Sequence, residues 1–158
     1  MCYYNKISKG YNELYKEEQL KKLGIIKNNI KIKNGDLLLD VGCGTGLSSD
    51  FGCKVIGIDN SLELLKLNNK KNKVMSCAEN LPFKDNALDY VVSLTAIHNF
   101  SNIEKSLKEM KRVGKNNFAF SILKKSKKLN EIKTLIKKYF KVNKIIEEDK
   151  DLIFFCEK

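Results

Sequence analysis

Two kinds of hydrophobic pattern alternate along the chain. The first is a short continuous apolar run, which is typical of a strand buried on both faces of a parallel sheet. Runs of this kind occupy residues 36–41, 54–58, 73–77, 88–94 and 117–123. The second is an apolar residue at every third or fourth position, which predicts an amphipathic helix. This spacing covers residues 12–23, 101–114 and 129–140, and a shorter helix is expected to carry Leu64, Leu65 and Leu67.

The order of these elements predicts an α/β protein with a largely parallel sheet. Strands that alternate with helices form right-handed βαβ units, which place helices on both faces of the sheet. Two further strand-like segments, 142–146 and 152–156, flank the polar sequence EEDKD, so we expect the chain to close with an antiparallel hairpin. In an open sheet of this kind, ligands bind at the carboxyl ends of the strands.

Polar residues mark where two of the helices are expected to begin. Asn60 with Glu63, and Ser101 with Glu104, have the spacing of capping boxes. The connection between the first two strands is short and leaves room only for a brief helix over residues 47–51.

Length and composition favour a single domain. The 158 residues, 42% of them hydrophobic, suffice for one modest core, and Pro82 is the only proline, so nothing marks a linker. We therefore expect one domain over 1–158, with an N-terminal helical segment at 1–34 and an α/β core at 35–158. No apolar run is long enough to span a bilayer, and the first ten residues lack the apolar stretch of a signal peptide. We expect a cytoplasmic protein that does not associate with a membrane.

The cysteines and the lone histidine argue against a metal centre. The chain has one histidine, His98, and its five cysteines form no CxxC pair. Zinc requires several Cys or His ligands in tetrahedral geometry, so we expect no metal site. The odd number of cysteines also argues against a complete disulfide framework and favours a reducing compartment.

The net charge of +11 is unevenly distributed. Residues 1–35 have a net charge of +5, residues 36–100 of −2 and residues 101–158 of +8, where sixteen basic residues face eight acidic ones. A basic surface gains affinity for a phosphate backbone through counterion release. All but one of the basic residues are lysines, however, and compositional bias explains the excess equally well. The nearly neutral middle of the chain is where we expect the chemistry to lie.

A glycine-rich segment follows the first predicted strand. In DVGCGTG the glycines Gly42, Gly44 and Gly46 occupy every second position, and without Cβ atoms they let a ligand approach the backbone. The dinucleotide fingerprint GxGxxG is absent because Leu47 occupies its last position, and the GK[ST] ending of a phosphate P-loop is absent too. The segment indicates a site for a nucleotide-like ligand of another kind.

An acidic residue ends the second predicted strand. Asp59 follows Gly46 by thirteen residues, where a carboxylate can accept hydrogen bonds from the two hydroxyls of a ribose. An acid at this place can also simply cap the next helix. Together with the glycine loop, Asp59 favours a ligand that carries an unphosphorylated ribose.

Three segments, LLLDVGCGTG, VIGIDNS and AENLPFKDNALDYVVSLTAIHNF, closely resemble the class I S-adenosylmethionine-dependent methyltransferases. The opening YYNKISKGYNELY resembles the branch near the ubiquinone and menaquinone methyltransferases. The resemblance is dense from Asp36 to about Gly114. It implies a three-layer Rossmann-like fold with a mostly parallel seven-stranded sheet, an antiparallel C-terminal hairpin strand, and S-adenosylmethionine as cofactor.

The resemblance also implies which residues would contact the cofactor. The loop from Gly42 to Gly46, Cys43 included, would pass under the methionine part, with Asp40 near its amino group, and Asp59 would hold the ribose. The remaining implied contacts are Asn60, Ala78 and Glu79 around the adenine, Leu94 and Thr95 under the cofactor, and Tyr11 closing the site. The chain departs from many relatives at Cys77, where they carry an acid that meets the adenine amino group.

Methyl transfer from a sulfonium is an in-line displacement that requires alignment of donor and acceptor and exclusion of water. His98 is the candidate general base because an imidazole titrates near neutrality and this one lies just beyond the fourth predicted strand. A histidine here can also simply pack against the loop. The segment SLTAIHNF lacks the Asn-Pro-Pro-aromatic motif that some relatives use to bind planar amino or amide nitrogens.

The methyl acceptor stays open at the level of the sequence. The connection at 123–129 has no room for an inserted lid domain, which suits a macromolecule, and the lysine-rich segments would then form a rim for RNA. GCGTGLSS somewhat resembles the ribosomal-RNA guanine-N7 methyltransferases that act with a small activator protein. We therefore expect one of three functions: a small-metabolite enzyme, an RNA or protein methyltransferase that requires a partner, or a non-catalytic cofactor-binding or scaffold subunit.

Overall fold

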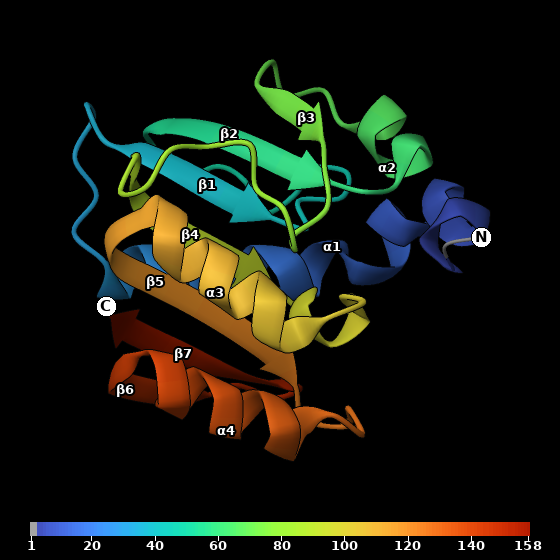
Figure 1. Cartoon of the computed structure of the whole chain (residues 1–158). Coiled ribbons are helices and arrows are strands. Elements are labelled where there is room, and N and C mark those ends of the chain that lie inside the picture. The colour runs from blue at the N-terminus through green and yellow to red at the C-terminus, as the bar shows by residue number, and fades with distance from the viewer. Residues whose placement is uncertain (1–2) are drawn as a thin grey trace.

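The structure is a computed structural model that describes the backbone of residues 3–158 and the side chains of residues 16–158 (Figure 1). In chain order the elements are α1 (Tyr3–Asn29), β1 (Leu37–Val41), β2 (Lys54–Asp59), α2 (Leu62–Leu67), β3 (Lys73–Met75), β4 (Leu88–Leu94), the 3₁₀ turn η1 (Ile97–Asn99), α3 (Ile103–Val113), β5 (Gly114–Leu123), α4 (Leu129–Tyr139), β6 (Lys141–Glu147) and β7 (Asp151–Glu157). Helices separate β2 from β3, β4 from β5 and β5 from β6, and a hairpin closes the chain.

The strands form one seven-stranded sheet in the order β3-β2-β1-β4-β5-β7-β6. All pairs from β3 to β5 are parallel, whereas β7 runs antiparallel to both β5 and β6. The order reverses direction next to β1, because the chain moves outward to β2 and β3 and then returns to β4 on the other side of β1. The mostly parallel sheet with an antiparallel end confirms the predicted fold class.

Helices cover both faces of the sheet. In Figure 1, α3 and α4 lie on the near face, and α1 passes behind the sheet. Neighbouring strand residues contribute to different cores: Leu39 belongs to the core under α3 and α4, and Leu38 to the core that includes Ile26 of α1. Burial on both faces is the physical reason why the strands read as continuous apolar runs. No helix among residues 3–158 is long and apolar enough to cross a membrane.

The two predicted capping boxes are wrong by one residue. The cap of α2 is Ser61, whose hydroxyl accepts the Leu64 N–H, because the Asp59 carboxylate accepts the Ser61 N–H and sets the turn before the helix. The cap of α3 is Asn102, whose side chain accepts the Lys105 N–H.

The expected partner in the second box is also engaged elsewhere. The Glu104 carboxylate contacts Lys138 and Tyr139 of α4 instead of turning back to the start of its own helix. A tertiary contact thus replaces the local one that the sequence spacing suggested.

The short helix expected over 47–51 does not form, and turns connect β1 to β2. The Ser49 hydroxyl donates to the buried Asp40 carboxylate at 2.6 Å, and Gly52 has a φ of 75°, so the segment bends toward the sheet. Phe51 is buried in the core on the α1 face. In contrast, α1 extends well beyond the predicted 12–23, to Tyr3–Asn29.

Candidate functional site

One pocket lies at the carboxyl ends of the parallel strands and encloses about 660 Å³ of space, part of it open to solvent. It occupies the place where the strand order reverses, at which open α/β sheets bind ligands. Eight of the thirteen site residues predicted from the sequence line it: Gly42, Gly44, Asp59, Asn60, Ala78, Glu79, Leu94 and Thr95.

The glycine loop is held close to the neighbouring strands. The backbone N–H groups of Gly42 and Cys43 both donate to the Ile58 carbonyl, at 2.8 and 2.9 Å. Gly42 has a φ of 80°, and a Cβ at this position would lie 2.5 Å from the Cβ of Ala96. Glycine is therefore required at position 42 for two reasons: its backbone conformation, and the close approach of the segment that follows β4.

Asp59 joins this loop to the start of α2. Its Oδ2 accepts the Gly44 N–H and its Oδ1 accepts the Ser61 N–H, both at 2.8 Å. The pKa of Asp59 is raised above its usual value, because the effect of burial exceeds that of the backbone hydrogen bonds, which lower the pKa. Each carboxylate oxygen can accept a second hydrogen bond, so the group remains available to donors in the pocket.

Asp40, Cys43 and Gly46 do not line the pocket, in contrast to the other predicted loop residues. Asp40 is buried beneath the loop, where burial raises its pKa to about 7 and the nearby Asp59 carboxylate adds to the increase. The Cys43 side chain lies against Gly57, and Gly46 packs against the side chain of Asn68. Cys43 and Gly46 thus attach the loop to β2 and to the end of α2, and Asp40 lies beneath it.

The segment after β3 forms another wall. Ala78 is buried, and the Glu79 carboxylate accepts the Asn102 N–H at 3.0 Å, which ties this segment to the start of α3. Ser76 also lines the pocket, whereas Cys77 has an exposed side chain and does not line it.

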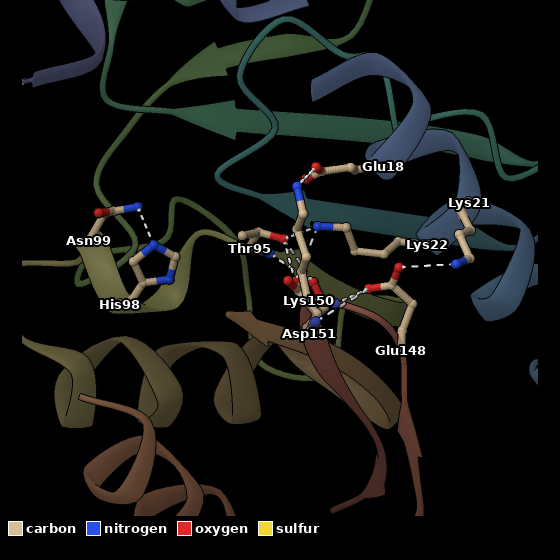
Figure 2. A network of polar contacts seen from close by, with 10 residues as sticks. Glu18, Lys21, Lys22, Thr95, His98, Asn99, Glu148, Lys150 and Asp151 are labelled. Atoms are coloured by element: carbon tan, nitrogen blue, oxygen red, sulfur yellow. Dashed lines mark hydrogen bonds and ion pairs between the residues drawn. The ribbon is translucent and has the colours of Figure 1, made fainter. Parts of the chain in front are cut away.

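Thr95 connects the pocket to a buried polar cluster (Figure 2). It directly follows β4 with a φ of 54°, a conformation that a β-branched residue rarely adopts. The Thr95 Oγ1 donates to the Asp151 carboxylate at 2.7 Å and accepts from the Lys22 ammonium at 2.6 Å. The Thr95 N–H bonds to Ser121 of β5. Lys22, only 1% exposed, and Asp151 form a buried ion pair, so α1, β4, β5 and β7 meet at this residue.

His98 lies in η1, just beyond Thr95, and does not itself line the pocket. Its Nε2 is 3.1 Å from the Nδ2 of Asn99, which does line it. Burial lowers the pKa of His98, while the Asp151 carboxylate opposes this shift and Lys128 and Lys22 add to it. The predicted contact of Tyr11 lies outside the side chains that the structure describes.

Sequence reasoning missed several residues of the wall, among them Ala96, Asn99 and Phe100. All three lie in the segment SLTAIHNF, in which the resemblance implies cofactor contacts only for Leu94 and Thr95. The signal that could have found them is their spacing from the end of β4. Among the described residues, no group of three or more His, Cys, Asp or Glu side chains could hold a metal ion.

Comparisons with known proteins agree with this geometry. The chain is 37% identical over 149 residues to an uncharacterised protein of Methanocaldococcus jannaschii, a match that covers 89% of this chain and 57% of that protein. It is 34% identical to the demethylmenaquinone methyltransferase of Staphylococcus carnosus, over 70% of this chain and 53% of the enzyme. It is 39% identical to the probable tRNA methyltransferase 9B of Mus musculus, over 51% of this chain and 20% of that protein. The chain thus spans 57% or less of the length of each of these relatives.

Among solved structures, one similar fold comes from the complex between the Haloferax volcanii Trm112 methyltransferase activator and a methyltransferase. The TM-score is 0.83, with 14% identity and coverage of 99% of this chain and 98% of that one.

The sheet order and the pocket at its switch point define a class I S-adenosylmethionine-dependent methyltransferase fold. A family described as a methyltransferase domain matches residues 39–122, from β1 through most of β5. The chain belongs to this family, and S-adenosylmethionine is the cofactor that membership implies.

Proposed function

We propose that this chain binds S-adenosylmethionine in the pocket and transfers its methyl group to an acceptor that approaches from the side of Thr95 and His98. The observation that carries this proposal is the convergence of the glycine loop, Asp59 and the segment after β4 on one pocket. Gly42 and Gly44 line the pocket without side chains, so the cofactor can lie directly against the backbone of the glycine loop.

Each wall of the pocket has a proposed role. Asp59 would accept hydrogen bonds from the ribose hydroxyls, and the backbone of Gly42 and Gly44 would lie under the methionine part. Asn60, Ala78 and Glu79 would surround the adenine. Asp40 lies beneath the loop, so its contribution would be to hold the loop in place through Ser49.

Bound S-adenosylmethionine supplies a methyl group on a positively charged sulfur. The residues of the chain then align the acceptor and exclude water, because the displacement needs a collinear approach of the nucleophile. Leu94, Ala96 and Phe100 provide an apolar wall for this purpose. His98, half-buried at the edge of this wall, is the proposed acceptor for the proton that the nucleophile loses.

For the acceptor, RNA and a small metabolite are both proposed, because the relatives include a probable tRNA methyltransferase and a demethylmenaquinone methyltransferase. The RNA alternative gains support from the loop between β5 and α4. Its lysines Lys125, Lys127 and Lys128 are exposed at the same edge of the sheet as the pocket. No salt bridge within residues 16–158 engages these three.

A small activator protein is a proposed partner, supported by the fold shared with a methyltransferase in complex with Trm112. A non-catalytic subunit that only binds the cofactor is the alternative to an enzyme.

Transfer of tritium from [methyl-³H] S-adenosylmethionine to total RNA, and separately to a lipid-soluble metabolite extract, tests the proposal. Incorporation that requires the wild-type chain and is lost in Asp59→Ala supports an enzyme, and the labelled fraction identifies the acceptor class. An absence of incorporation in RNA, in the metabolite extract and in total protein, with and without an activator of the Trm112 type, would favour the non-catalytic alternative.

A further inference from the structure

Thr95 adopts a backbone conformation that its own side chain disfavours. Its φ of 54° lies in the left-handed region, which β-branched residues rarely occupy and which costs conformational free energy. Among the described residues, the one other non-glycine residue with a positive φ is Asn86, and asparagine tolerates this conformation because its side chain is short and polar. The surroundings of Thr95 must therefore hold it in place.

A buried ion pair binds the side chain of Thr95 (Figure 2). The Thr95 Oγ1 accepts a hydrogen bond from the Lys22 ammonium at 2.6 Å and donates one to Oδ2 of Asp151 at 2.7 Å. The two charged groups are 3.2 Å apart, and the two residues are 1% and 0% exposed. The Thr95 N–H donates to the carbonyl and hydroxyl oxygens of Ser121, at 3.0 and 2.9 Å. Contacts from α1, β5 and β7 thus fix one residue.

This ion pair is an inefficient source of stability. Burial removes the hydration of both charges, and their mutual attraction seldom repays more than that loss. In addition, Oδ1 of Asp151 has no hydrogen-bond partner among the residues that the structure describes, which adds a further cost. Both charged groups nevertheless converge on the hydroxyl of Thr95. Their specific effect is therefore on the conformation of Thr95.

The conformation of Thr95 sets the position of the pocket wall that follows it. The next residue, Ala96, lies so close to the glycine loop that a Cβ added to Gly42 would be 2.5 Å from its Cβ. The Phe100 ring comes within 3.6 Å of the same point. All four residues line the pocket. Because φ and ψ are the soft torsions of the backbone, a change of φ at Thr95 would rotate the chain that follows and move this wall relative to the loop.

We propose that Lys22 and Asp151 are positioning residues of the cofactor pocket. By binding its hydroxyl, they hold Thr95 in the left-handed conformation and keep the segment after β4 against the glycine loop. The consequence for S-adenosylmethionine rests on the proposed function, whereas the effect on Thr95 exists without the cofactor. Docking of α1 and binding of the cofactor are then coupled, and each stabilises the other by the same factor.

The conformation of Thr95 can be measured in the protein without cofactor. The chain has three threonines, Thr45, Thr95 and Thr134, so protein labelled with ¹³C and ¹⁵N only at threonine gives three amide signals, whose NMR couplings report the sign of φ. We expect a positive φ at Thr95 in the wild type. In Lys22→Met/Asp151→Leu, which removes both charges together, we expect Thr95 to leave the left-handed region.

The matched control removes a neighbouring ion pair that does not contact Thr95. Lys21→Met/Asp149→Leu breaks an exposed 2.6 Å pair between the same helix and the turn before β7, and we expect it to keep the positive φ. A further variant covers the case in which the first double substitution does not fold. Thr95→Val removes only the hydroxyl, and its φ should become negative although both charges are present.

Titration calorimetry with S-adenosylmethionine tests the consequence for the pocket. We expect an affinity about tenfold weaker in Lys22→Met/Asp151→Leu, and a change below about twofold in the control. Glycine adopts a positive φ without strain, so in a Thr95→Gly background the same double substitution should change the affinity by less than about twofold. An ion pair that acted only on overall stability would have the same effect on affinity in both backgrounds.

Two results would overturn the proposal. One is a positive φ at Thr95 in the folded Lys22→Met/Asp151→Leu variant, and the other is an effect of this double substitution on affinity that is equal in the two backgrounds. A folded wild-type chain that does not bind S-adenosylmethionine would instead refute the proposed function, and the sign of φ would still decide whether the ion pair positions Thr95.

Discussion

At the scale of single residues, Gly42 illustrates how closely the pocket is built. Its positive φ and the position of Ala96 leave no room for a side chain, whereas a Cβ added to Gly35, which precedes β1, would have nothing within 4 Å. The two glycines differ in surroundings although they are close in sequence. One shapes the site and the other only ends a loop.

We predict that Gly42→Ala weakens S-adenosylmethionine binding by at least about tenfold, on the order of 1.4 kcal/mol, because the loop must shift away from Ala96. Titration calorimetry measures this effect. Gly35→Ala is the control and should bind as the wild type does. Equal affinity of both variants would contradict the role assigned to the loop.

Asp40 provides a pH-dependent prediction at the same scale. Its pKa of about 7 in the folded protein lies above its usual value of 3.8, so between these pH values the folded state binds more protons than the unfolded state. The free energy of unfolding therefore falls as pH rises from about 4 to about 7. We predict that Asp40→Asn, which lacks this loss, becomes more stable relative to the wild type as pH rises. Urea denaturation at several pH values tests it, and a difference that does not vary with pH would refute it.

At the scale of elements, α1 is held to the sheet by two different kinds of contact. Ile26 is fully buried in the core on this face, and the ion pair of Lys22 with Asp151 joins the same helix to β7. Leu20, on the same helix, is 44% exposed. The helix therefore contributes both to stability and to the wall that Thr95 forms.

We predict that Ile26→Ala lowers the free energy of unfolding by about 2–4 kcal/mol, because it leaves a cavity under α1. Leu20→Ala should change it by less than about 1 kcal/mol, since little surface is lost there. Chemical denaturation of both variants decides the matter. Similar small effects in both would mean that α1 is not packed as described.

The sequence predicted the elements where pattern alone determines them. β1, β2, β4 and β5 could be located because a strand buried on both faces reads as an unbroken apolar run. The glycine loop and Asp59 could be assigned to the pocket because their spacing places them at the carboxyl ends of neighbouring strands. Local rules sufficed for these features.

Other features depend on contacts that no local pattern contains. The ion pair of Lys22 with Asp151 joins residues 129 positions apart, and neither residue stands out in the sequence. The start of α2 was missed by one residue because the Asp59 carboxylate, and not the cap itself, sets the preceding turn. The helix expected over 47–51 was lost to a side-chain contact between Ser49 and Asp40.

At the scale of the whole molecule, charge is the feature that bears most on the acceptor. The net charge of +11 is concentrated outside the middle of the chain, and exposed lysines occur at both edges of the sheet. Lys125, Lys127 and Lys128 are at the edge of the pocket. Lys31, Lys33 and Lys54 are exposed at the opposite edge, where β1 and β2 begin. If RNA is the acceptor, the lysines at the pocket edge should contribute more to RNA binding than those at the opposite edge. If the lysine excess reflects only compositional bias, the two sets should contribute equally.

We predict that the wild-type chain binds RNA with an affinity that falls steeply with salt, because each phosphate contact releases counterions. Substitution of the three pocket-edge lysines by glutamine should reduce the slope of log K against log salt by about 2, at roughly 0.7–0.9 per contact. The same change at Lys31, Lys33 and Lys54 should leave it nearly unaltered. Fluorescence anisotropy with a labelled tRNA gives the slopes, and equal slopes for the two variants would rule out a specific RNA edge.

The central claim is that the pocket at the carboxyl ends of the strands binds S-adenosylmethionine through Asp59. Titration calorimetry of the purified chain with S-adenosylmethionine, S-adenosylhomocysteine and NAD tests it most directly. The account predicts binding of the first two and none of NAD, with an affinity at least about tenfold weaker, or about 1.4 kcal/mol, in Asp59→Ala. The exposed acid Asp50, changed to alanine, serves as control. Unchanged affinity in a folded Asp59→Ala variant, or no binding by the folded wild-type chain, would contradict it.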